Sequence, residues 1–311
     1  MMHIMIVGAG SLGLLFAAKL SECSHRLTIV TRTKDQAQAL QEHGIVLDGT
    51  RMAARNIVVE SFEDGQAGSG GDPDFIFLMV KQTAITDELI AGVKSLMAAK
   101  TVLVCFQNGI GHEQRLGSAV GSDKLLLAVT TEAARKEGSN AVSHTGKGIT
   151  YIGAIEAAGH EPVPEGLQIL LTDLMEKAGV SAEMSKNMVM RIWTKLLINA
   201  VINPLTAILR VKNGDLLRSP STIALMRDLF DEAMLLAAAK QISLPEDLWE
   251  TIQHVCKATA RNHSSMLQDV MLKRNTEIDS MNGSLLRLAE ALQIELPIHR
   301  TVYRLVKALE E

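Results

Sequence analysis

The chain has 311 residues, of which 47% are hydrophobic and 21% are charged, a composition typical of a globular protein with an ample core. A net charge of −4, with lysines and arginines scattered along the sequence, disfavours nucleic-acid binding, and nothing in the composition favours a membrane partner. Three widely spaced cysteines favour reduced thiols in a cytoplasm, the histidines lack the spacing of a metal site, and the length suggests two domains.

The first element is a short apolar run, residues 3–7, which suits a buried parallel strand. A turn with the spacing GxGxxG follows it and leads into a helical segment; its residues are Gly8, Ala9, Gly10, Ser11, Leu12 and Gly13. In this setting Gly8 makes the tight turn, Gly10 lets the backbone approach a pyrophosphate, and Gly13 lets the helix pack closely on its strand. The pattern predicts a dinucleotide-binding turn.

The second predicted strand, residues 27–30, lacks the carboxylate that usually follows when the cofactor has a free ribose 2′-hydroxyl. Thr31-Arg32-Thr33-Lys34 stands there instead. A guanidinium forks well onto a phosphate, so Arg32 predicts NADP(H) as the cofactor. The alternative is that Arg32 is an ordinary solvated arginine.

Two further apolar runs, residues 75–80 and 101–106, have the length and composition of central parallel strands. Lys81 follows the first and Asn108 follows the second. Ligands of a doubly wound sheet lie beyond the carboxyl ends of its strands, so Lys81 and Asn108 are expected on the cofactor side of the site. By position alone, either residue is equally well an ordinary loop residue.

Strand patterns continue to about residue 184 and then stop. Further strands are expected over 125–131, 141–145, 149–153 and 180–184, with a Gly-Lys-Gly turn between the second and the third. Helical periodicity then runs through 221–241, 246–260, 276–293 and 298–309. The sequence therefore predicts an α/β Rossmann-type dinucleotide-binding domain in residues 1–182, followed by an all-α helical domain in residues 183–311.

The most informative segment opens that second domain. Lys195, Asn199 and Asn203 are spaced four residues apart on an otherwise apolar helix, and Pro204 closes the run. This spacing places one ammonium and two carboxamides on one face. An unpaired polar group in an apolar setting costs on the order of 1–3 kcal/mol, so something polar should meet this face. The alternative is a buried ladder of hydrogen bonds or an exposed edge.

A second polar cluster follows in the helical domain. It contains Ser264 and Ser265 and, further along the chain, Glu277. Either serine can simply cap a helix, and Glu277 can lie on a solvated face; the cluster alone does not decide between these interpretations and a ligand site.

Taken together, these features resemble the ketopantoate reductase (2-dehydropantoate 2-reductase) family, the NADPH enzymes of pantothenate and coenzyme A biosynthesis. The resemblance covers essentially the whole chain, and its helical-domain motifs are more specific than the glycine pattern. It rests on Gly8-x-Gly10-x-x-Gly13, Val80-Lys81, Gln107-Asn108-Gly109, Lys195-x-x-x-Asn199-x-x-x-Asn203-Pro204-Leu205-Thr206-Ala207, Asn213-Gly214, Ser264-Ser265-Met266-Leu267-Gln268-Asp269 and Thr276-Glu277-Ile278-Asp279.

The resemblance implies a role for each polar residue. Lys195 would be the general acid, and Ser265 would bind the substrate carboxylate. Glu277 would contact the nicotinamide ribose or assist at the reacting oxygen. The groups that would position the substrate's hydroxyl and carbonyl are Asn199, Asn203 and Asn213. Lys81 and Asn108 would hold the cofactor side.

The chemistry of the residues agrees with these roles. Reducing a 2-keto acid needs a hydride at C2, a proton or strong hydrogen bond at the developing alkoxide, and a partner for the carboxylate. Because the glycine turn and Lys195 lie in different predicted domains, the substrate is expected to bind between them. The alternatives are a reductase of another small 2-keto acid and a non-catalytic NADPH-sensing protein. A homodimer is compatible with the sequence, which does not fix the oligomeric state.

Overall fold

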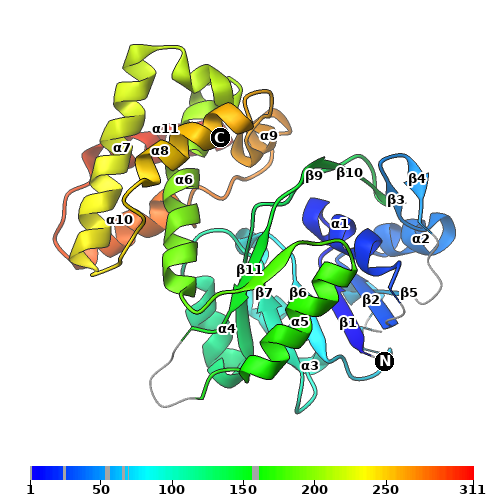
Figure 1. Cartoon of the computed structure of the whole chain (residues 1–311). Helices are drawn as coiled ribbons and strands as arrows, with labels where there is room; N and C mark the ends of the chain where they lie inside the picture. Colours follow the sequence, from blue (N-terminus) through cyan, green and yellow to red (C-terminus); the bar gives the residue numbers. More distant parts are fainter. Residues whose placement is uncertain (1, 24–25, 53–56, 65–66, 69, 156–160) are drawn as a thin grey trace. The chain divides into compact units, whose positions relative to one another are not determined.

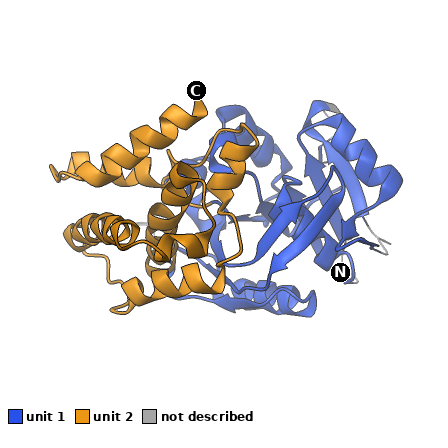
Figure 2. Cartoon of the chain, turned by 90° about the horizontal axis from the view of Figure 1, so that it is seen from above, with its two compact units in different colours: residues 1–107, 112–188 blue, residues 108–111, 189–311 orange. Residues whose placement is uncertain are grey.

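The computed structural model describes residues 2–23, 26–52, 57–64, 67–68, 70–155 and 161–311 (Figure 1). The chain divides into two compact units (Figure 2). Unit 1 consists of Met1–Gln107 and His112–Met188, and unit 2 of Asn108–Gly111 and Val189–Glu311. The long segment of unit 2 begins at Val189 and not at residue 183, because Ala182–Met184 (β12) is a strand of the large sheet of unit 1.

Unit 1 is built on an eight-stranded sheet with the strand order β12-β11-β8-β7-β6-β1-β2-β5. The other strands are β1 (His3–Val7), β2 (Arg26–Thr31), β5 (Ile57–Ser61), β6 (Phe75–Leu78), β7 (Val102–Cys105), β8 (Leu125–Thr130) and β11 (Thr150–Gly153). In the part of the sheet with the order β8-β7-β6-β1-β2-β5, neighbouring strands are parallel, whereas β11 runs antiparallel to β8. The order of the parallel strands is that of a doubly wound dinucleotide-binding sheet, so the predicted Rossmann-type class is confirmed.

The helices of unit 1 connect these strands. They are α1 (Ser11–Leu20), α2 (Lys34–His43), α3 (Asp87–Leu96), α4 (His112–Val120) and α5 (Glu165–Lys177), with short 3-10 turns η1 (Phe62–Asp64), η2 (Gln82–Ala84) and η3 (Ser122–Lys124). Every residue of β1 is buried, and Phe16 of α1 packs edge-on against Phe77 and Phe106. Helix α1 is therefore fixed on the centre of the sheet, where the glycine turn lies.

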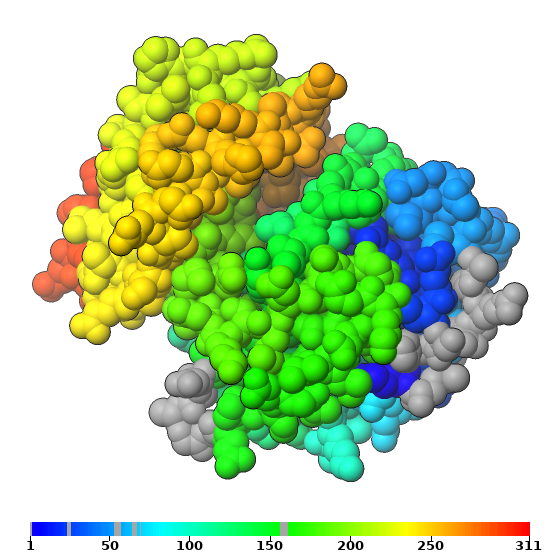
Figure 3. All heavy atoms as spheres, in the orientation of Figure 1, coloured from blue at the N-terminus to red at the C-terminus, as the bar shows by residue number. Residues whose placement is uncertain are grey.

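Unit 1 also contains a second, four-stranded sheet, which was not predicted as a separate sheet. Its order is β4 (Thr50–Arg51), β3 (Val46–Leu47), β10 (Ala141–Gly146), β9 (Ala133–Lys136). The strands expected over 141–145 and 149–153 are both present, but they belong to different sheets and do not pair with each other. Strands β3, β9 and β10 pack against α1, and Figure 3 shows them as blue and green surface next to it.

Unit 2 consists of helices, as expected for the second domain. They are α6 (Met188–Leu209), α7 (Pro220–Ala239), α8 (Leu248–Ala258), α9 (Ser265–Met271), α10 (Asn282–Ala291) and α11 (Pro297–Glu310), with the 3-10 turn η4 (Asn213–Leu217). The expectation of one helix over 276–293 was wrong at its start, because α10 begins only at Asn282. Glu277 therefore lies in the turn before the helix and not on a helical face.

Helix α6 contributes many side chains to the core of unit 2. Its side chains Trp193, Leu196, Leu197 and Val201 are buried in the core of this unit. By length and composition alone α6 is apolar enough to cross a membrane, but most of that apolar stretch is buried inside the fold, as in a core helix. Pro204 follows the last of the three polar residues but does not end the helix, since α6 continues through Pro204 to Leu209.

Candidate functional site

The glycine turn of unit 1 has the shape that a dinucleotide requires. A Cβ on Gly13 would lie 1.9 Å from the carbonyl oxygen of Gly8, so only glycine lets α1 pack this closely on the turn. A Cβ on Gly10 would meet nothing within 4 Å, so the backbone is open to an approaching group at that point. Ser11 and Leu12 start helix α1, whose first turn contains no acidic residue. These residues fit a bound pyrophosphate.

Two side chains from outside the turn donate hydrogen bonds to it, and neither was predicted as a site residue. Nε2 of Gln36 donates to the carbonyl oxygen of Ala9 at 2.8 Å, and Nζ of Lys136 donates to the same oxygen at 3.2 Å. The backbone N–H of Lys136 also donates to Oγ of Ser11 at 3.2 Å. Their partners are distant in the sequence, so only the folded sheet brings them to the turn.

Arg32 and Lys81 both lie where strands of the large sheet end. Arg32 follows β2 directly and is exposed, and Lys81 is exposed between β6 and η2. Nε2 of Gln107 donates to the carbonyl oxygens of Leu78 at 2.8 Å and Val80 at 3.0 Å. Gln107 therefore ties the segment after β7 to the segment before Lys81.

On α6 the three predicted polar residues differ in burial. Lys195 and Asn199 are partly buried, whereas Asn203 is buried, with Nδ2 3.8 Å from Sδ of Met281. Burial lowers the pKa of Lys195 from 10.5 to about 8, and the negative charge of Glu277 acts in the opposite direction. The ammonium is thus still the main form at neutral pH, but it releases its proton more readily than an exposed lysine does.

Glu277 is buried in the turn before α10, and Nδ2 of Asn108 donates to its Oε2 at 3.2 Å. Asn108 follows β7 in the chain but belongs to unit 2. The structure therefore brings together Asn108, Glu277 and Lys195 within unit 2, whereas Lys81 belongs to unit 1.

Pro204 leaves one carbonyl of α6 without its helical donor, because proline has no N–H to offer to Ala200. Nδ2 of Asn282 fills this place and donates to the carbonyl oxygen of Ala200 at 3.0 Å. Asn282 also bonds Nδ1 of His299 at 2.9 Å, while Nε2 of His299 bonds the carbonyl oxygen of Leu229 at 3.0 Å. The tautomer that satisfies all three bonds is neutral, with its proton on Nε2. Burial agrees, since it lowers the pKa of His299 to about 4.

The two adjacent serines take different places. Ser264 caps α9 by accepting from the N–H of Leu267 at 3.0 Å, and it accepts from Oγ1 of Thr206 at 2.7 Å. The capping interpretation is thus correct for Ser264. Ser265 is the first residue of α9, and it is exposed. It remains available for a ligand.

Asn213 is buried at the start of η4. Its Nδ2 donates to Oγ1 of Thr259 at 2.9 Å, and its backbone N–H donates to the carbonyl oxygen of Asn262 at 3.1 Å. Among the side chains that the structure describes, Oδ1 of Asn213 is a buried acceptor without a hydrogen-bond partner. A buried acceptor of this kind is suited to a ligand that donates a hydrogen bond.

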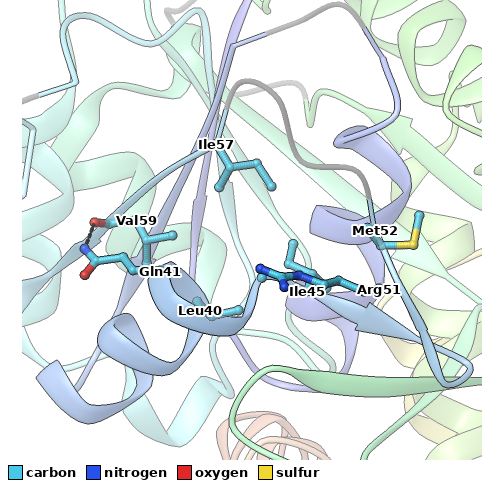
Figure 4. A pocket seen from close by; sticks show the side chains of 8 residues that line it. Leu40, Gln41, Ile45, Arg51, Met52, Ile57 and Val59 are labelled. Carbon is cyan, nitrogen blue, oxygen red and sulfur yellow. Dashed lines mark hydrogen bonds between the residues drawn. The ribbon is translucent and has the colours of Figure 1, made fainter.

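A pocket of about 380 Å³ lies elsewhere in unit 1, under the β3–β4 hairpin (Figure 4). It is lined by Leu40, Gln41, Gly44, Ile45, Arg51, Met52, Ile57 and Val59. None of these was predicted as a site residue. Within the described ranges, no group of three or more His, Cys, Asp or Glu residues is arranged to hold a metal ion.

The chain matches known proteins over nearly its whole length. The family described as "Ketopantoate reductase PanE/ApbA" matches residues 4–157, and "Ketopantoate reductase PanE/ApbA C terminal" matches residues 187–310. The 2-dehydropantoate 2-reductase of Bacillus subtilis is 35% identical, and the alignment covers 99% of this chain and 98% of that protein.

Two solved structures have the same fold over 99% of this chain. A PanE/ApbA family ketopantoate reductase from Ralstonia eutropha is 28% identical, with 98% of its chain covered and a TM-score of 0.87. D-mandelate dehydrogenase in complex with NADH is 25% identical, with 99% of its chain covered and a TM-score of 0.88.

Proposed function

The chain belongs to the ketopantoate reductase family, and from this premise we propose that it reduces 2-dehydropantoate to pantoate with NADPH, in pantothenate and coenzyme A biosynthesis. The observation that carries the proposal is the group of Lys195, Glu277 and Asn108, which supplies a titratable ammonium beside a buried carboxylate. The three cysteines are free thiols, which suits a cytoplasmic enzyme.

The cofactor would be held by backbone and by two cations. The turn Gly8, Ala9, Gly10, Ser11, Leu12 and Gly13 would take the pyrophosphate, because Gly10 leaves the backbone accessible there. Arg32, exposed directly after β2, would pair with the 2′-phosphate, and Lys81 would add a positive charge on the same side. When bound, the reduced nicotinamide supplies the hydride that C2 of the substrate needs.

Lys195 would supply the proton. As C2 is reduced, negative charge gathers on the carbonyl oxygen, where an ammonium stabilises it more in the transition state than in the ground state. A pKa of about 8 lets Lys195 remain protonated at neutral pH and still transfer its proton to an alkoxide. Glu277 keeps that pKa from falling further, and Asn108 orients the Glu277 carboxylate through its hydrogen bond.

The substrate would be positioned by side chains whose hydrogen-bonding groups complement its own donors and acceptors. Oδ1 of Asn213, whose amide nitrogen is already committed to Thr259, would accept from the hydroxyl of ketopantoate. Asn199, partly buried one turn after Lys195, would contact the same face of the substrate, and Asn203 one turn further on would shape its end. Exposed Ser265 would donate to the carboxylate.

A second candidate is the reduction of a different 2-keto acid, which the likeness to D-mandelate dehydrogenase with NADH favours. The test is the oxidation of NADPH and NADH, followed by absorbance, with ketopantoate, 2-ketoisovalerate, oxaloacetate and an aromatic 2-keto acid. The proposal expects the highest kcat/KM for ketopantoate with NADPH. A higher kcat/KM for the aromatic acid with NADH would replace the proposal by the second candidate.

A further inference from the structure

Glu277 lies in a segment without helix or strand, residues 276–279, that comes shortly before α10. Thr276, Glu277 and Ile278 are buried, whereas Asp279 is partly exposed. A buried backbone N–H needs an acceptor, and a segment outside a helix or sheet has to find it in another element. The position of the Glu277 carboxylate therefore depends on the contacts of the residues on either side of it.

The helix α11 (red in Figure 1) holds this segment at its first residue. Oε1 of Glu310 accepts from the backbone N–H of Thr276 and from its Oγ1, each at 2.7 Å. Burial alone would raise the pKa of Glu310, but hydrogen bonds from Lys307 and Thr276 outweigh burial and lower that pKa. Glu310 is thus a charged acceptor with a side chain only 8% exposed.

The same helix holds the segment at its last residue. Oδ1 of Asp279 accepts from the hydroxyl of Tyr303 at 2.5 Å, and Oδ2 accepts from Nζ of Lys307 at 3.2 Å. Nζ of Lys307 also pairs with Oε2 of Glu310 at 2.6 Å, so one ammonium joins the two carboxylates. Positions 303, 307 and 310 lie on one face of a helix. Glu277 is therefore flanked by residues that are bonded to these three side chains, the α11 anchor.

We propose that Glu310 is a positioning residue, which acts through Thr276 to fix the Glu277 carboxylate relative to the ammonium of Lys195, and that the rest of the α11 anchor supports it. This inference deepens the proposed function, because it takes Lys195 to be the proton donor. Burial lowers the pKa of Lys195 to about 8, and the charge of Glu277 opposes that fall. A displaced Glu277 would therefore leave the pKa of Lys195 lower still.

The pKa of Lys195 is the readout, because a loss of fold stability alone does not move it. It is measured without substrate, from the pH dependence of the rate at which a small acylating reagent labels Lys195 in the full chain, followed by mass spectrometry of the peptide. For Glu310→Ala we expect this pKa, and the alkaline limb of kcat/KM, to fall by about half a unit or more. Glu277→Gln should lower the pKa at least as far.

Two comparisons distinguish an effect of position from an effect of charge. Glu310→Gln removes the charge but keeps an oxygen that can accept from Thr276, so it should retain most of the wild-type pKa of Lys195. In a Glu277→Gln background, Glu310→Ala should change the pKa of Lys195 little further, because the carboxylate that it positions is already gone.

Two further variants complete the set. Tyr303→Phe removes only the hydroxyl donor of the α11 anchor, so we expect a smaller fall of the same sign in the pKa of Lys195, and it serves as the test if Glu310→Ala does not fold. Arg300→Met is the matched control, because it breaks an exposed ion pair between the same helix and Glu295, and it should leave that pKa unchanged.

An unchanged pKa of Lys195 in folded Glu310→Ala, or in Tyr303→Phe where the first variant does not fold, would overturn the inference. An equal fall in Glu310→Gln would overturn it too, because the charge of Glu310 would then act directly, and so would a fall that persists in the Glu277→Gln background. The proposed function fails separately. A protein whose Lys195 responds as expected but which does not oxidise NADPH with ketopantoate would refute the reaction and leave this inference in place.

Discussion

The glycine turn of unit 1 and the face of α6 that carries Lys195, Asn199 and Asn203 (the Lys195 face) present different groups to a ligand. The turn offers backbone, and its shape depends on glycines that are close together in the sequence. The Lys195 face offers side chains on a helix that contains a proline, and it depends on Asn282, His299 and Glu277, which lie far along the chain. A backbone site can therefore be recognised from a short motif, whereas a side-chain site needs the rest of its unit to be folded.

The largest expected effect is on the side-chain site. Lys195→Met keeps the length and packing of the side chain but removes its donor, so kcat should fall by roughly 10²–10³ or more while NADPH binding survives. With a pKa of about 8 for Lys195, kcat/KM of the wild type should decline above about pH 8, and this limb should disappear from the residual activity of the variant. A well-folded Lys195→Met protein with normal kcat would refute the mechanism. The mechanism would also be refuted if wild type and Lys195→Met both bound NADPH but neither turned over the substrate.

Arg32 tests whether a single side chain next to the backbone site determines which cofactor is bound. A charge-assisted contact contributes about 1.5–3 kcal/mol, so Arg32→Ala should weaken NADPH roughly ten- to a hundredfold and leave NADH nearly unchanged. Titration of both cofactors by fluorescence measures this. Equal weakening of NADPH and NADH would mean that Arg32 does not recognise the 2′-phosphate.

Substitutions at two of the three glycines of the turn, Gly13 and Gly10, should separate an effect on folding from an effect on cofactor binding. In Gly13→Ala the new methyl would overlap the carbonyl of Gly8, so the free energy of unfolding in urea should drop by about 1–3 kcal/mol. In Gly10→Ala the methyl meets open space, so stability should stay within about 0.5 kcal/mol while NADPH affinity falls. A stable Gly10→Ala protein with normal NADPH affinity would show that the ligand does not approach the turn at Gly10.

A double-mutant cycle of Asn282 and Pro204 tests how the Lys195 face depends on a residue of another helix. Asn282→Ala should cost about 1–3 kcal/mol of unfolding free energy, because the carbonyl of Ala200 and Nδ1 of His299 both lose a donor. In a Pro204→Ala background the restored backbone N–H can bond that carbonyl, so the same change should cost about 1 kcal/mol less. Equal costs in both backgrounds would show that Asn282 does not compensate for the proline.

The sequence predicted most of unit 1 because its signals are local. Strand-length apolar runs gave the central strands, and GxGxxG between a strand and a helix gave the turn. The four-stranded sheet was not anticipated, because β3 and β4 have two residues each and β3 pairs with β10 across nearly a hundred residues. For the same reason Gln36 and Lys136 could not be linked to Ala9 from the sequence.

In unit 2 the types and spacing of the polar residues predicted the candidate site, but the ends of the helices that carry these residues could not be predicted from the sequence. The spacing of Lys195, Asn199 and Asn203 predicted the shared face, but the general rule that a proline ends a helix does not hold for α6. The rule fails here because Asn282, a residue of another helix, supplies the missing donor. Glu277 was placed on a helix because the apolar periodicity of α10 extends backwards past its true start at Asn282.

The buried imidazole of His299 also determines how unit 2 tolerates acid. Its pKa is about 4 in the folded chain, whereas an unfolded histidine titrates near 6.5. Between these values the unfolded chain binds a proton that the folded chain excludes, so the contribution to stability is complete above about pH 6.5 and is lost as the pH falls through 4. The loss is on the order of 3 kcal/mol, and His299→Gln should flatten this part of the pH dependence, as urea unfolding at several pH values would measure. Protonation would put a positive charge next to the amide group of Asn282, and so mild acid would weaken α6 at the turn that carries Asn199 and Asn203.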